Sequence, residues 1–250
     1  MTSFRHAAAA LSLLVLSSAA AHAQTADEII EKHLAATGGR AALSKLTSRV
    51  STGSISLTTP VGEVAGTIEV SAKTPNKSRT LIKLDLTALG AGTMTSDQRF
   101  DGTTGYVIDS LQGNREIGGD QAAVMRSTSF PSPLLDYKAH GTTVTLDGQE
   151  KVGAKDAYAL TLKPQAGPSF RLFIETDTFM LVKTVIKLNV PEAGGDIEQT
   201  IELSDFRDVD GFKIPFVTKS SNRLQSVSSV TTEVKHNVPL DDSSFAKPAQ

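Results

Sequence analysis

The sequence predicts a mainly β protein built on a curled antiparallel sheet, and three observations point to it. From Ser48 onward, apolar and polar residues alternate with a period of two, as in strands that bury one face. Turns rich in glycine, proline and asparagine separate these segments at short intervals. Only two or three short helical patterns interrupt the alternation. About twelve strands are therefore expected between residues 48 and 234.

Residues 1–23 have the pattern of a secretory signal peptide. Arg5 supplies the positive charge, residues 7–20 form an apolar stretch, and Ala21-His22-Ala23 is a small-x-small cleavage site. The apolar core is far shorter than the roughly 20 residues that a membrane-spanning helix needs. We therefore expect cleavage after Ala23, a periplasmic location and no transmembrane segment in the mature chain.

The mature chain, residues 24–250, is expected to form one domain that opens with helices at 24–46. Thr25 and Glu28 have the spacing of a capping box, in which each side chain satisfies a backbone amide of the other. Ile29, Ile30, His33 and Leu34 follow on one helical face. Gly38-Gly39 ends this helix, because glycine adopts a left-handed conformation at little cost.

Residues 118–140 break the strand pattern. They contain a short helical stretch that Asp120 is expected to cap and then a proline-containing segment with several apolar residues. These residues need a surface to pack on, so we expect this insertion to cover the sheet or to close the mouth of a barrel. A sheet of about twelve twisted strands does not stay flat. It curls into an incomplete barrel or splits into a sandwich, and its interior is either filled or hollow.

The sequence contains no recognisable catalytic or metal-binding pattern. The chain has no cysteine, which excludes disulfides and a lipid-modified N-terminal cysteine. His33, His140 and His236 lie far apart, and no nucleophile or phosphate-loop motif is present. The formal net charge of −2 gives no reason to expect nucleic acid as a partner. We therefore predict no catalytic residues, no metal and no cofactor.

Four segments resemble the exported LolA/LolB-like proteins that sort outer-membrane lipoproteins. They run from the first helix to the C-terminus: residues 26–43, residues 100–107 (FDGTTGYV), residues 205–216 (DFRDVDGFKIPF) and residues 237–245. The resemblance implies an incomplete barrel of about eleven antiparallel strands. It also implies a helical lid over the mouth and a concave apolar surface that holds acyl chains. Together, pattern and resemblance predict about 11–12 strands.

The resemblance also identifies a departure from the family pattern. In lipoprotein carriers an arginine in an Arg-Pro-Asn turn holds the lid closed, whereas the corresponding turn here is Thr74-Pro75-Asn76. Threonine lacks the fork of donors that a guanidinium provides. Arg79, further along the next strand, is the candidate substitute.

Our leading hypothesis is a non-enzymatic periplasmic carrier for lipid-like ligands, with lipoprotein acyl chains as possible cargo and envelope membrane proteins as possible partners. The alternative is a structural or interaction protein of the cell envelope whose core is filled. The candidate ligand-binding wall consists of apolar residues on alternating positions of four expected strands: Phe170, Leu172, Ile186, Ile201, Ile214 and Phe216. A register error of one residue would place any of them on the outer face.

Overall fold

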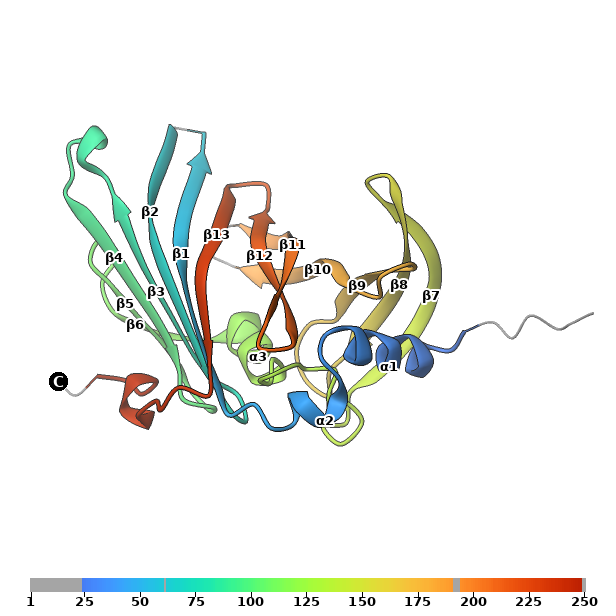
Figure 1. The fold of residues 1–250 in the computed structure, drawn as a ribbon. Coiled ribbons are helices and arrows are strands. Elements are labelled where there is room, and N and C mark those ends of the chain that lie inside the picture. Colours follow the sequence, from blue (N-terminus) through green and yellow to red (C-terminus); the bar gives the residue numbers. More distant parts are fainter. Residues whose placement is uncertain (1–23, 61, 191–193, 249–250) are drawn as a thin grey trace, which may run out of the picture.

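The structure is a computed structural model that describes residues 24–60, 62–190 and 194–248, and the expected signal peptide lies outside these ranges. The described chain forms one 13-stranded sheet with the order β6-β5-β4-β3-β2-β1-β13-β12-β11-β10-β9-β8-β7. The mainly β prediction is confirmed, with slightly more strands than expected. The edge strands β6 and β7 do not pair with each other, so the sheet curls without closing (Figure 1).

The strands are β1 (Ser48–Thr59), β2 (Gly62–Lys73), β3 (Lys77–Asp85), β4 (Thr93–Phe100), β5 (Gly105–Asp109), β6 (Arg115–Ile117), β7 (Thr143–Val152), β8 (Lys155–Lys163), β9 (Phe170–Glu175), β10 (Leu181–Val190), β11 (Gly195–Val209), β12 (Phe212–Ser221) and β13 (Ser226–His236). The helices are α1 (Ala26–Ala36), α2 (Arg40–Leu43) and α3 (Gly119–Ser127). Short 3-10 turns occur at Thr87–Leu89 and Asp242–Ser244.

Helix α1 begins as the sequence predicts. The Glu28 amide donates to the Thr25 hydroxyl at 3.2 Å, and the Thr25 amide donates to the Glu28 carboxylate at 2.8 Å. Both bonds satisfy amides that the first helical turn leaves without a partner. His33 is buried, as expected, and its Nδ1 donates to the Phe179 carbonyl at 2.9 Å. This bond fastens α1 to the turn between β9 and β10.

Two strand glycines allow β1 and β2 to lie unusually close to the neighbouring strands. A Cβ on Gly66 would lie 1.9 Å from the Lys83 carbonyl oxygen, and one on Gly53 would lie 2.2 Å from the Val230 carbonyl oxygen. Only glycine allows neighbouring strands to approach this closely. Gly53, which adjoins the register shift between β1 and β13, and Gly66 are therefore positions where a side chain would collide with the neighbouring strand.

The strand pairing defines the inner face across the whole sheet. Ile186 on β10 lies opposite Phe170 on β9, and both pack under the helices. Because side chains of directly paired residues share a face, the register carries this face onward to β1–β6. At the far side, Val107 and Ile117 on this face contact α3. The assignment is therefore consistent from one edge of the sheet to the other.

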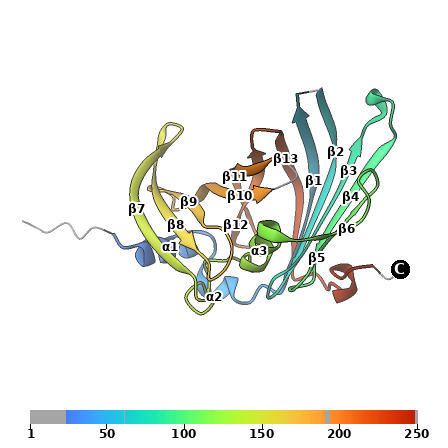
Figure 2. The same ribbon diagram turned by 180° about the vertical axis from the view of Figure 1, so that it is seen from behind.

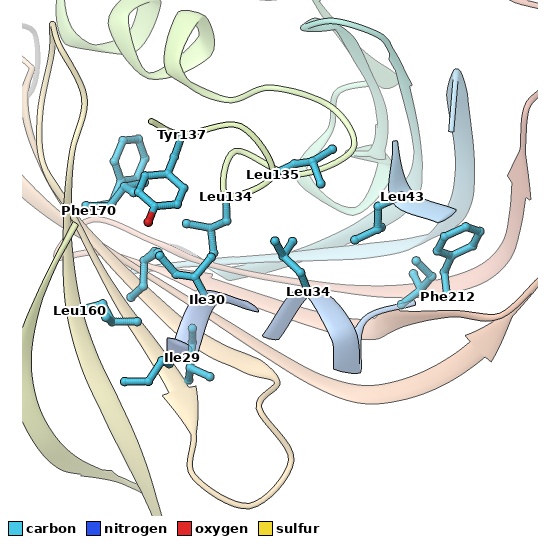
Figure 3. Packing of buried hydrophobic residues seen from close by; sticks show 14 of the residues in the cluster. Ile29, Ile30, Leu34, Leu43, Leu134, Leu135, Tyr137, Leu160, Phe170 and Phe212 are labelled. Carbon is cyan, nitrogen blue, oxygen red and sulfur yellow. The ribbon is translucent and has the colours of Figure 1, made fainter. Parts of the chain in front are cut away.

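The helices lie on the inner face of the sheet, and each covers a different part of it. Side chains of α1 insert among residues of β8 and β9 and the segment after α3, forming the main buried cluster (Figure 3). Helix α3 lies between the two arms of the sheet in both ribbon views (Figures 1 and 2). It packs on β5 and β6 through Ala122, while Asp120 accepts a hydrogen bond from the Asn189 amide of β10 at 2.8 Å. The expectation that residues 118–140 pack on the sheet thus agrees with the structure, although Asp120 does not cap its helix.

The C-terminal segment packs on the opposite, outer face. The Lys73 ammonium contacts the Asp242 carboxylate and the Leu240 carbonyl, both at 2.7 Å. Phe245 is fully buried. On the same face, the buried Asp97 carboxylate accepts from Arg79 and Arg99 at 2.8 Å. No described helix is long and apolar enough to cross a membrane.

Candidate ligand-binding surface

Five of the six predicted wall residues lie on the inner face, but α1 and the segment after α3 cover them. Phe170, Leu172, Ile186, Ile214 and Phe216 belong to one buried cluster that also contains Ile29, Ile30, Leu34 and Leu134 (Figure 3). Each is at most 9% exposed. In this structure these side chains form protein core, and a ligand reaches them only if the covering segments move.

Ile201, the sixth, is different. It is half-buried and lies opposite Thr184 on β10 and Ser220 on β12. The same row continues through Val227 to Leu57 on β1. Ile201 therefore connects the covered half of the inner face with the half formed by β1–β3.

Polar contacts hold the covering segments together. Asp27 of α1 accepts from the Tyr137 hydroxyl and pairs with Lys138. The hydrogen bonds from Lys138 and Tyr137 lower the pKa of Asp27. Arg40 of α2 donates to the Leu135 carbonyl. Helices α1 and α2 and residues 130–138 therefore form one connected cover over β8–β12, which we call the plug.

The inner face of β1–β3 carries an apolar surface outside the plug. We define the β1–β3 patch as the neighbouring inner-face residues Leu57, Val64, Ile68, Val70 and Ile82. Four of them are half-buried and Val70 is 37% exposed. In the part of the chain that the structure describes, none of the five belongs to the buried clusters beneath the helices. The patch is thus apolar surface of the inner face that the helices leave accessible.

The turn at Thr74-Pro75-Asn76 holds the segment after α3, but through its backbone. The Phe130 amide donates to the Pro75 carbonyl at 2.9 Å. Arg79 does not act as the substitute latch considered from the sequence: its Nε and Nη2 donate to Asp97 on the outer face, away from the plug. Arg79 faces outward because strand residues alternate between the two faces and its neighbours Ser78 and Thr80 face inward.

Arg49 is a strand arginine that contacts Phe130 of this segment, and the sequence reasoning missed it. Its guanidinium carbon lies 5.4 Å from the centre of the Phe130 ring. Arg49 occupies an inner-face position of β1 opposite His236. The sequence could have indicated this position. Arg49 is an even number of residues away from Ile55 and Leu57 on the same strand, so it shares their face.

A separate cleft of about 690 Å³ lies beside the end of α3. Pro75, Ser127, His140 and Gln165 are among its lining residues. The cleft is lined by α3 and by loops, and it contains none of the six predicted wall residues. Among the described residues no group of His, Asp and Glu side chains could hold a metal ion.

Comparisons with known proteins identify the fold. No protein-family model matches the sequence, and no curated protein matches it. Solved structures do match. A LolA superfamily protein from Nitrosomonas europaea has a TM-score of 0.57 and 16% identity, over 90% of this chain and 99% of that one.

The fold is LolA-like. A putative outer membrane lipoprotein-sorting protein domain from Vibrio parahaemolyticus gives a TM-score of 0.55 at 11% identity, covering 88% of this chain and 95% of the domain. A DUF1329 family protein from Desulfovibrio piger gives 0.56 at 14% identity, covering 87% and 95%. At such identities the similarity establishes the LolA-like fold alone.

Proposed function

We propose that this protein is a periplasmic carrier that binds lipid-like ligands, lipoprotein acyl chains among them, against the β1–β3 patch. The observation that carries the proposal is this apolar patch, which lies on the concave side of an unclosed sheet and outside the plug. Concave, mostly apolar surfaces with few polar groups are typical of lipid-binding sites.

The energetics of such binding follow from burial. Each methylene moved from water onto the patch contributes roughly 0.8 kcal/mol. A chain that covers several patch residues therefore gains enough to offset the entropy lost on association. Binding by sequestration needs no catalytic group, which agrees with the absence of any recognised catalytic motif in the sequence. The signal-like pattern of residues 1–23 supports a periplasmic location.

A second candidate function is a structural or interaction protein of the cell envelope. The plug favours it, because Ile29, Ile30 and Leu34 already fill the inner face of β8–β12. In that case the half-buried patch would contribute to the core and would bind no lipid. The two candidates differ in one measurable respect, namely whether the purified chain carries or takes up acyl chains.

The test compares two exposed valines on opposite faces of the sheet. Val70 is 37% exposed on the inner face, and Val230 is 42% exposed on the outer face, opposite Ser54. We expect Val70→Glu to weaken binding of a fluorescent acyl probe at least about tenfold, because ligand contact would desolvate the new carboxylate. Val230→Glu should leave binding unchanged.

Both variants should unfold in urea within about 1 kcal/mol of the unaltered protein, because both sites are exposed strand positions. Lipids extracted from the purified protein and identified by mass spectrometry provide an independent readout. No probe uptake and no extracted lipid would favour the structural alternative. Equal loss of binding in the two variants would show that the patch is not the site.

A further inference from the structure

Arg49 stands at one end of the β1–β3 patch. On the inner face its direct neighbours are His236 on β13 and Ala72 on β2. The next inner-face position along β1 is Ser51, which lies opposite Val70. A strand rises about 3.4 Å per residue, so the patch extends from beside Arg49 to Leu57 over about 27 Å. The inner face thus has a cation at one end of a long apolar path.

The hydrogen bonding of Arg49 leaves much of its guanidinium unused. Its Nε donates to Nε2 of His236 at 3.2 Å, while Nη1 and Nη2 donate to no protein atom in the described chain. Because Nε can only donate, Nε2 of His236 must accept. Nδ1 of His236 then carries the proton and donates to Asp210 at 3.1 Å. This tautomer makes the His236 ring neutral, so it adds no second positive charge beside Arg49.

The charge of Arg49 has no carboxylate beside it. Among the described residues no Asp or Glu oxygen lies within 4.0 Å of its guanidinium, and Asp210 reaches it only through His236. Burial lowers the pKa of Arg49 to about 10, so the side chain remains charged at neutral pH. The Phe130 ring at 5.4 Å offsets part of the cost of this burial. A half-buried cation without an anion is a costly arrangement that an anionic ligand would relieve.

We propose that Arg49 anchors the carboxylate of a long-chain fatty acid whose alkyl chain lies along the β1–β3 patch. This inference rests on the proposed carrier function and names its ligand class. A planar guanidinium with two free donor groups matches a carboxylate in shape and charge. One cation neutralises one negative charge, which suits a monocarboxylate better than a bulkier phospholipid headgroup that brings two acyl chains.

The experiment compares palmitate with methyl palmitate, which has the same chain and no charge. Each ligand displaces a neutral fluorescent acyl probe from the full mature chain at neutral pH. The unaltered protein should bind palmitate at least about tenfold more tightly than the ester, as expected for hydrogen bonds to a charged group. This comparison needs no variant and so cannot be spoiled by misfolding.

Arg49→Met keeps an unbranched, flexible stem that can still pack against Phe130 and removes the charge. It should weaken palmitate binding at least about tenfold and leave methyl palmitate within about twofold, and Arg49→Lys should restore part of the palmitate affinity. Lys83→Met, at an exposed outer-face position of β3, is the matched control and should change neither ligand.

The possible failures are distinguishable. If neither ligand binds the unaltered chain, the proposed carrier function fails and the inference fails with it. If both bind with equal affinity, or if Arg49→Met weakens both equally, acyl binding stands while Arg49 only supports Phe130, and the inference alone is overturned. A third arm uses dipalmitoyl phosphatidylglycerol: dependence on Arg49 for this lipid but not for palmitate would also overturn it.

Discussion

Truncation of Leu172 separates the two roles that the inner face could have. Leu172 is 5% exposed on β9, where it lies opposite Leu160 of β8 and Thr184 of β10 in the cluster under α1. Leu172→Ala leaves a cavity that the plug cannot fill without moving. Buried leucine-to-alanine changes cost about 3–5 kcal/mol when the site cannot collapse. For a chain of this size, about 3 kcal/mol corresponds to a decrease in Tm of roughly 6–12 °C.

The same change should not affect ligand affinity if the ligand occupies the β1–β3 patch. Urea unfolding measures the loss of stability, and titration with a fluorescent acyl probe measures affinity per folded molecule. Ile201→Ala is the counterpart: Ile201 is half-buried in the inner-face row that leads through Ser220 and Val227 to Leu57 of the patch, so it should lose only about 1 kcal/mol of stability. It should nevertheless weaken probe binding severalfold.

The reverse pattern would refute this reasoning. If Leu172→Ala costs less than about 1 kcal/mol and abolishes probe binding while Ile201→Ala leaves it intact, the ligand lies beneath α1. The plug would then be a lid that opens, and the wall residues predicted from the sequence would be the binding site.

Two further predictions concern the sheet itself. Gly66→Ala should destabilise the protein by more than about 3 kcal/mol or prevent folding, because its Cβ would lie 1.9 Å from a carbonyl oxygen. Gly92→Ala, with no atom within 4 Å of its Cβ, should change the unfolding free energy by less than about 1 kcal/mol. Burial alone would raise the pKa of Asp97, but hydrogen bonds from Arg79 and Arg99 outweigh it, and the net pKa is lowered. The folded form therefore gains stability from this group above about pH 4 and loses it as the pH falls through the lowered pKa. Asp97→Asn should cost about 2–3 kcal/mol at neutral pH and flatten the decrease in stability below pH 4 measured by urea unfolding, whereas an unchanged acid dependence would contradict this assignment.

Local patterns in the sequence predicted those features that depend on neighbours in the chain. The capping box of Thr25 and Glu28 and the buried face of α1 depend only on residues three or four positions apart. The period-two alternation likewise predicted that Phe170 and Leu172 share one face of a strand. The alternation alone left an incomplete barrel and a sandwich open; the resemblance to LolA/LolB-like proteins implied the incomplete barrel, and the structure has one curled, unclosed sheet.

The tertiary structure decided which part of the inner face is covered. Leu172 and Ile201 have similar patterns in the sequence, yet Leu172 lies under α1 and Ile201 is half-buried outside that cluster. The difference depends on where a helix from the N-terminus packs on parts of the sheet more than 100 residues away, as the hydrogen bond between His33 and the Phe179 carbonyl at the β9–β10 turn, 146 residues apart, illustrates.

The two arginines show the same division. Arg49 and Arg79 both lie on strands, and the sequence singled out Arg79 because it follows the turn at Thr74. The register places Arg79 on the outer face with Asp97 and Arg49 on the inner face beside Phe130. Successive residues of a strand face opposite sides of the sheet. Proximity in the sequence therefore indicated a basic residue near this turn, but it could not indicate which arginine faces the interior. The strand pairing decided that.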